Sequence, residues 1–178
     1  TRQANALTSR IRQAKFPVEK GLENFDFSAS KTVNKQKVLE LARCEWITQR
    51  SNVCLLGQPG TGKTHLAIAL GNSAARHGHK VRFFTAAGLV NLLEEKQKNY
   101  RLDHFLNQLD RTDLLICDEL GYLSFSRAGA ELLFQVFADR YERRSLLITS
   151  NTGNWHSAWQ PITLTRLSKY TTTCLDFR

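Results

Sequence analysis

Residues 57–64 of this chain, which include three glycines, a lysine and two threonines, match the pattern G-x-x-x-x-G-K-[ST]. An apolar run at 53–56 precedes them and a helix-like stretch at 65–76 follows. Backbone N–H groups at the beginning of a helix bind phosphate, because they are unpaired and lie at the positive end of the helix dipole. The sequence therefore predicts a site for a nucleoside triphosphate, formed by Gly57, Gln58, Pro59, Gly60, Thr61, Gly62, Lys63, Thr64 and His65.

Each residue type in this loop has a separate expected role. The glycines permit tight backbone conformations, so that the N–H groups can approach and surround the phosphates. Lys63 is expected to bring a compact positive charge to the β and γ phosphate oxygens, which makes it a catalytic candidate. The hydroxyl of Thr64 is expected to ligate Mg²⁺.

Two carboxylates follow a second apolar run, at 114–117. Asp118 is expected to hold the same Mg²⁺, directly or through water, as the acidic residue at the end of such a strand does in P-loop proteins. Glu119 is then placed to activate the attacking water as a general base. The alternative is that these are two surface acids after a core strand.

A third apolar run, at 146–148, leads to Thr149, Ser150 and Asn151. Asn151 is expected to hydrogen-bond the γ-phosphate or hold the attacking water, although asparagine is also a frequent turn residue at strand ends. Because open α/β sheets bind ligands outside the carboxyl ends of their strands, we expect these groups to meet at one edge.

The elements that would position these groups can be predicted from apolar spacing. Short continuous runs at 53–56, 81–84, 114–117 and 146–148 predict strands of a parallel sheet, and Arg82 indicates that the second of these lies near an edge. Helical spacing predicts helices near 4–15, 35–49, 62–76, 87–98, 101–110 and 127–142. This alternation predicts an α/β sandwich with a parallel central sheet.

Length and composition favour an ordinary globular domain. The chain has 178 residues, 42% of them hydrophobic, and no apolar stretch approaches the ~20 residues that cross a bilayer. Residues 1–20 are basic and polar, unlike a secretory signal. The cysteines, at 44, 54, 117 and 174, lack metal-site spacing and predict free, buried thiols. We therefore expect a soluble, cytoplasmic protein that does not contact membranes.

The formal charge of +9 favours a polyanionic partner such as nucleic acid, with a solvated basic surface as the alternative. No base-reading motif is evident, so DNA contact is expected to involve the phosphate backbone, to tolerate sequence and to weaken with salt. The candidate contacts are Arg10, Arg12, Lys15, Arg140, Arg143 and Arg144.

Several further segments resemble the AAA+ ATPases, and within them the IstB-like transposition helpers and DnaC-like helicase loaders. They are 16–20, 25–27, 57–65, 118–123, 129–136, 138–143 and 149–151, so the resemblance covers about residues 10–151. It implies a P-loop NTPase (AAA+) fold, a three-layer α/β/α sandwich with a parallel central sheet. It also implies a bacterial insertion-sequence helper that binds ATP and Mg²⁺, assembles on DNA, deforms it and recruits or stimulates a transposase.

The resemblance also divides the chain. Residues 1–30 are expected to be a basic remnant and connector, 31–151 the ATP-binding core, and 152–178 a divergent tail without regular structure. Members of the family carry an N-terminal partner domain and a C-terminal arginine finger. The spacing to 164–167 is too short for that finger, so we expect the C-terminal part to be truncated or divergent. The chain also lacks methionine, so we expect it to be a fragment. It would be an ATPase in principle, with slow turnover, because such a finger contributes ~10³ to 10⁵ in rate.

Three other functions stay open at this point. A replicative helicase loader would use the same ATPase core with a different partner. A non-catalytic module would use ATP only to control assembly on DNA. A small-molecule P-loop kinase is disfavoured, because no lid pattern for an acceptor is evident. The expected partners are therefore DNA, a transposase or replicative helicase, and further copies of the chain on DNA.

Overall fold

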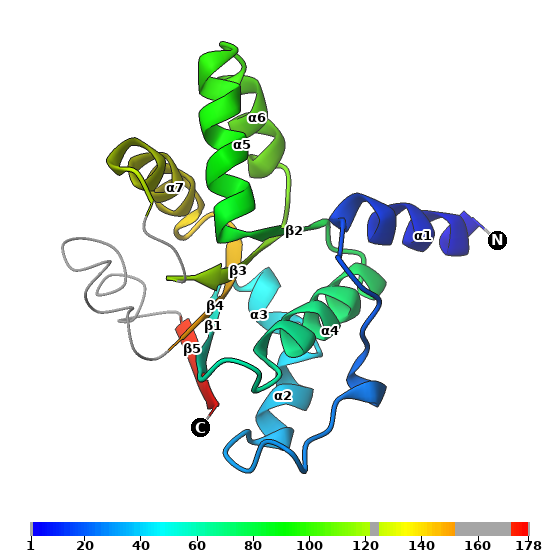
Figure 1. Ribbon diagram of the computed structural model, residues 1–178. Helices are drawn as coiled ribbons and strands as arrows, with labels where there is room; N and C mark the ends of the chain where they lie inside the picture. Colours follow the sequence, from blue (N-terminus) through cyan, green and yellow to red (C-terminus); the bar gives the residue numbers. More distant parts are fainter. Residues whose placement is uncertain (1, 122–124, 152–171, 178) are drawn as a thin grey trace.

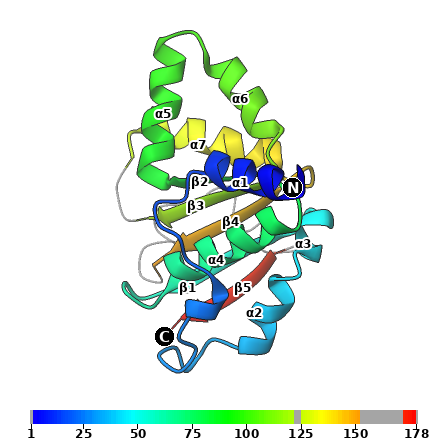
Figure 2. The same cartoon turned by 90° about the vertical axis from the view of Figure 1, so that its right-hand side faces the viewer.

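The computed structural model describes residues 2–121, 125–151 and 172–177. Its centre is a five-stranded sheet in the order β2-β3-β4-β1-β5, in which every pair of neighbours is parallel (Figure 2). The strands are β1 (Asn52–Gly57), β2 (Val81–Thr85), β3 (Leu114–Leu120), β4 (Ser145–Ser150) and β5 (Thr172–Phe177). The four strands expected from the apolar runs are confirmed, and so is the edge position of β2.

Two layers of helices cover the sheet, one on each face (Figures 1 and 2). One layer and its connector contain α1 (Arg2–Ala14), the 3-10 turn η1 (Leu22–Asn24), α2 (Lys35–Leu41), α3 (Glu45–Thr48) and α4 (Lys63–Arg76). The other contains α5 (Ala86–Lys98), α6 (Leu102–Asp110) and α7 (Arg127–Arg140). The expected three-layer α/β/α sandwich is therefore confirmed. Among the described helices, none is long and apolar enough to span a membrane.

The alternation of side chains along the central strands builds two separate apolar cores. Val53 and Leu55 of β1 point to the layer of α4, whereas Cys54 between them points to the layer of α5 and α7. Every residue of β4 is buried, as expected for a strand covered on both faces. This burial explains why the strands read as continuous apolar runs.

The single helix expected at 35–49 is wrong, because the chain turns between α2 and α3. Cys44 has a left-handed backbone conformation with φ of 63°, which a continuous helix does not allow. The indole Nε1 of Trp46 donates to the backbone oxygen of Leu41 at 2.9 Å. The turn lets both short helices bury their apolar residues in the same core.

Residues 172–177, which lie in the segment expected to be a divergent tail, form β5. Leu175 and Phe177 are buried, and Phe177 accepts a hydrogen bond from the backbone N–H of Gln58 at 3.3 Å. Only these two large apolar residues alternate in the segment, which leaves a weak strand signal. The segment 164–167, considered above for the arginine finger, lies outside the described residues.

Candidate nucleotide-binding site

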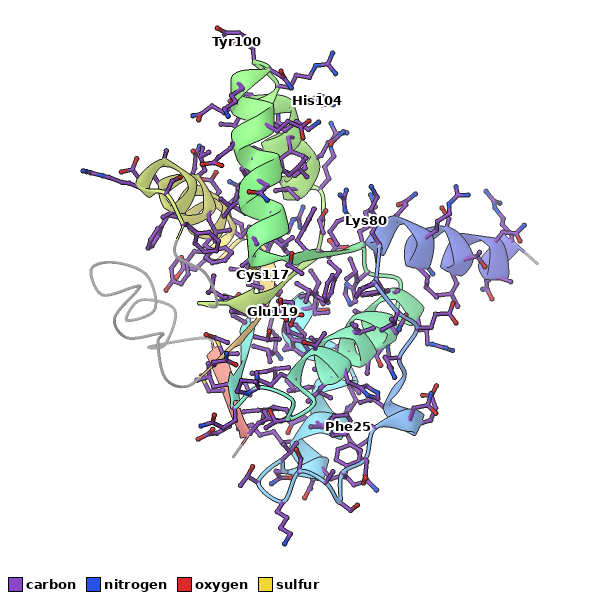
Figure 3. The ribbon with its side chains drawn as sticks, viewed as in Figure 1. Phe25, Lys80, Tyr100, His104, Cys117 and Glu119 are labelled. Carbon is purple, nitrogen blue, oxygen red and sulfur yellow. The ribbon has the colours of Figure 1, made fainter. Side chains whose placement is uncertain are left out.

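Three strands that are neighbours in the sheet, β3, β4 and β1, bring the predicted chemistry to the same edge. The glycine-rich loop follows β1, the two acids end β3, and Asn151 follows β4. Because the strands are parallel, their carboxyl ends meet there, as expected. Figure 3 shows Glu119 at the end of β3, next to Cys117.

The loop itself needs glycine at two positions for conformational reasons. Gly60 and Gly62 have φ of 76° and 93°, in the left-handed region that other residues rarely adopt. Gly62 directly precedes α4, and a Cβ there would lie 3.1 Å from the ring of Phe25. Gly57 is required for a different reason, since its Cβ would overlap the backbone oxygen of Phe177 in β5.

The ammonium group of Lys63 lies inside the loop. Its Nζ donates to the backbone oxygens of Gly57 and Gln58 at 2.8 and 2.6 Å, and the residue is only 8% exposed. Burial lowers the pKa of Lys63 below its ordinary value, and the nearby charge of Asp118 opposes this shift. An ammonium held by two carbonyl groups can exchange them for phosphate oxygens without leaving the loop.

Thr64 and Asp118 join the loop to the end of β3. The hydroxyl oxygen of Thr64 lies 3.0 Å from both carboxylate oxygens of Asp118, although it has one proton to donate. Asp118 is 3% exposed, so its carboxylate depends on such donors. Hydroxyl, carboxylate and water oxygens are the ligands that Mg²⁺ prefers. This donor set therefore fits the expected ion.

Thr149 holds both acids in place, a role that the sequence analysis did not assign. Its hydroxyl donates to Asp118 Oδ1 and accepts the backbone N–H of Glu119 at 2.9 Å. Ser150, the next residue of β4, donates to the backbone oxygen of Leu120. The sequence signal for this role was the presence of two adjacent hydroxyl residues, Thr149 and Ser150, directly after an apolar run.

Glu119 differs from Asp118 in exposure, because β3 bulges at this point. The register of β3 against β4 shifts between Cys117 and Leu120, and Glu119 has φ of 61°. Bulges redirect side chains, and left-handed conformations of non-glycine residues cluster at functional sites. The result is a buried carboxylate on Asp118 and an exposed one on Glu119.

The roles predicted for His65 and Asn151 in nucleotide binding stay predictions. The ring of His65 contacts the connector before α2, with Nε2 3.1 Å from the backbone oxygen of Gly21 and an edge contact to Phe25 at 5.2 Å. Asn151 is half-buried directly after β4. The connector, where Figure 3 labels Phe25, therefore contacts the first turn of α4.

The prediction that Arg140 contacts DNA is wrong. This residue is 2% exposed, and its guanidinium donates to four backbone oxygens, those of Leu109, Thr112, Asp113 and Ser145, at 2.8–3.3 Å. Burial lowers its pKa to about 10. It joins the end of α7 to α6, β3 and β4, and it is unavailable to a polyanion.

The other candidate DNA contacts differ in availability. Arg143 pairs with Asp110 at 3.2 Å, and Arg144 donates to the backbone oxygen of the same residue at 2.9 Å. Arg10 donates to the backbone oxygen of Ala75 at 2.9 Å. Arg12 and Lys15 are exposed on and after α1, and Arg143 is exposed as well.

A glycine-rich loop between a buried strand and a helix, facing a buried carboxylate on the parallel strand one beyond its neighbour in the sheet, defines the class of P-loop NTPases. The sequence matches the family model described as "IstB-like ATP binding protein" over residues 1–169, and the chain belongs to this family.

Curated relatives come from insertion sequences. The chain is 44% identical over 153 residues to an IS21 protein of Pseudomonas aeruginosa that is named for ATP binding, covering 85% of this chain and 57% of the relative. It is 38% identical over 156 residues to the corresponding protein of IS5376 from Geobacillus stearothermophilus, covering 86% and 62%. The chain thus spans less than two thirds of the length of either relative.

Solved structures share the fold. A structure of AMPPCP-bound DnaA from Aquifex aeolicus has a TM-score of 0.73 at 23% identity, covering 90% of this chain and 51% of DnaA. A structure of the DnaC helicase loader has a TM-score of 0.65 at 20% identity, covering 95% and 99%. At these identities the likeness establishes the AAA+ fold alone.

Proposed function

We propose that this chain binds ATP with Mg²⁺ and serves as an AAA+ helper in the transposition of a bacterial insertion sequence. The observation that carries the nucleotide part is the contact between Thr64 and Asp118, at 3.0 Å across the edge of the sheet. Family membership and the insertion-sequence relatives support the transposition part.

In this proposal the loop binds and orients the triphosphate. Its backbone N–H groups and the ammonium of Lys63 bind the phosphates, so that Lys63 leaves the carbonyl groups of Gly57 and Gln58. Thr64 and Asp118 would hold Mg²⁺, which neutralises developing phosphate charge when bound. Thr149 keeps the Asp118 carboxylate directed at this position.

Hydrolysis, in the same proposal, depends on Glu119. Its exposed carboxylate follows the buried metal ligand and is free to accept a proton from water, while Asp118 is committed to its hydroxyl donors. Asn151 would orient the same water or the γ-phosphate from the end of the neighbouring strand. DNA and a transposase are the proposed partners, and self-association on DNA is part of the proposal.

A titration with a fluorescent ATP analogue, with and without Mg²⁺, tests the nucleotide site. Removing the hydroxyl in Thr64→Val is expected to lower affinity in Mg²⁺ by roughly 10- to 100-fold, because a hydrogen bond or ligand to a charged group is lost. Thr112→Val is the matched control, since the Thr112 hydroxyl also donates a hydrogen bond but lies just before β3, at the opposite end of that strand. A folded parent chain without affinity for adenine nucleotides would refute the proposal.

Turnover by Glu119→Gln separates an ATPase from a non-catalytic ATP-gated module. We expect nucleotide affinity to be retained and the rate to fall by roughly 10²- to 10⁴-fold, the usual contribution of a general base. Equal turnover in the parent chain and the variant would favour the non-catalytic module. Pull-downs with a cognate transposase and with a replicative helicase distinguish a transposition helper from a helicase loader.

A further inference from the structure

Two cysteines face each other across the β1–β5 pair. Cys54 and Cys174 are register partners on neighbouring parallel strands, so their side chains project to the same face of the sheet. Neighbouring strands lie about 4.8 Å apart, within the range of Cα separations that a disulfide spans. Both residues are free thiols in this structure.

The environments of the two thiols are unequal. Cys54 is 3% exposed, whereas Cys174 is exposed at the edge strand. A hydrogen bond from Cys54 lowers the pKa of Cys174 to about 7, and the charge of Lys37 acts in the same direction, while the pKa of Cys54 is raised. Cys174 therefore carries substantial thiolate at neutral pH, and thiolate is the reactive form.

The other two cysteines lack these properties. Cys44 and Cys117 are buried, and burial raises their pKa values to about 11 and about 12. Buried thiols of this kind are inert toward polar oxidants. The chain therefore contains one accessible, partnered thiol and two internal controls.

We propose that Cys54 and Cys174 form a redox modification site that takes a hydroperoxide as its oxidant and closes to an intramolecular disulfide. The Cys174 thiolate attacks one peroxide oxygen, the O–O bond breaks, and hydroxide leaves to give a sulfenic acid. The sulfur of the Cys54 thiol then attacks the sulfenic sulfur, its proton passes to the leaving oxygen, the S–O bond breaks, and water leaves. In sum, two thiols and one hydrogen peroxide give one disulfide and two waters.

The disulfide would tie β5 to the strand that delivers the phosphate loop. Cys54 lies near the end of β1, three residues before Gly57, and Phe177 lies three residues after Cys174. The backbone oxygen of Phe177 accepts from Gln58 of the loop. Oxidation would therefore fix the edge strand against the base of the loop.

The first test oxidises the full chain with hydrogen peroxide, blocks remaining thiols under denaturing conditions and maps peptides by mass spectrometry without reduction. We expect the four free thiols to fall to two, with one peptide pair joined through Cys54 and Cys174, and dithiothreitol to restore all four. Cys44→Ser should behave like the parent, and Cys174→Ser should form no disulfide. A different pairing or an intermolecular product would overturn the proposal, and so would oxidation of Cys174 to a sulfinic or sulfonic acid with Cys54 left as a free thiol.

The second test measures the rate of iodoacetamide alkylation against pH. One thiol of the native chain should react with a midpoint near pH 7, and Cys54→Ala should move this midpoint upward, because the hydrogen bond to Cys174 is lost. The disulfide should also raise the melting temperature by roughly 5–15 °C, since it closes a long loop in the unfolded chain. An unreactive Cys174 in the folded parent chain, or a midpoint that stays unchanged in Cys54→Ala, would overturn the assignment.

Discussion

Thr149→Val most directly tests how the acidic end of β3 is held. The hydroxyl of Thr149 is buried, donates to the Asp118 carboxylate and accepts the N–H of Glu119 at 2.9 Å. Valine keeps the branched shape but has no hydroxyl. The substitution therefore removes a donor to a buried charge and leaves a backbone N–H without its acceptor.

The expected magnitude follows from these two bonds. A hydrogen bond to a charged group contributes about 1.5–3 kcal/mol, and a buried donor deprived of its partner costs about 1–3 kcal/mol. Because the two losses share one atom and are not additive, we expect the free energy of unfolding to fall by about 2–4 kcal/mol. For a domain of this size that corresponds to a melting temperature roughly 4–16 °C lower.

Thermal and urea denaturation measure this loss, and ATP turnover measures its effect on the site. Thr149→Ser retains the hydroxyl and should stay close to the parent chain in turnover. In Thr149→Val, turnover should fall more than nucleotide affinity, because the backbone of Glu119 loses its anchor. If Thr149→Val matches the parent chain in both stability and turnover, the hydroxyl does not position the acids and the reasoning is wrong.

Three further changes give separate expectations. Arg140→Leu removes the donors to four backbone oxygens, so urea denaturation should show a loss of at least about 3 kcal/mol, with DNA affinity unchanged. Gly57→Ala forces a Cβ onto the backbone oxygen of Phe177, and titration should show a nucleotide affinity roughly tenfold lower. Changing Arg12 and Lys15 together to alanine should reduce the slope of log affinity for DNA against log salt by about 2, measured by fluorescence anisotropy.

Controls and contrary outcomes are available for each change. Arg143→Leu affects an exposed ion pair and should alter stability by less than about 1 kcal/mol; an equal loss in both arginine variants would contradict the structural role of Arg140. Nucleotide affinity unaffected by Gly57→Ala would mean that β5 does not constrain the loop. An unchanged salt slope would remove Arg12 and Lys15 from the DNA surface.

Much of the fold was predictable because its signals are local. Buried parallel strands require continuous apolar runs, and the helix beginning at Arg127 has a cap at Ser126 whose hydroxyl accepts the N–H of Gly129 at 3.0 Å. The break between α2 and α3 was not predictable, because it depends on an indole that bonds a carbonyl five residues earlier. β5 was not predicted, because the strand with which it pairs, β1, is distant from it in the sequence.

In the site, too, some residues were predictable from the sequence and others were not. The motifs of the loop and the acidic pair are contiguous, so residue types and spacing alone identified Lys63, Thr64 and Asp118 as candidates. The roles of Thr149 and Arg140 depend on partners about thirty residues away, and composition could not distinguish a buried arginine from a surface one.

The class of chemistry could be deduced from residue types over short spans, since these specify a glycine-rich turn, an ammonium, a hydroxyl and carboxylates. The folded arrangement was needed to show which hydroxyl holds the acids, which cation is buried and which thiols face each other. Those relations arise from strand order and register, which bring distant residues into contact and remove them from water.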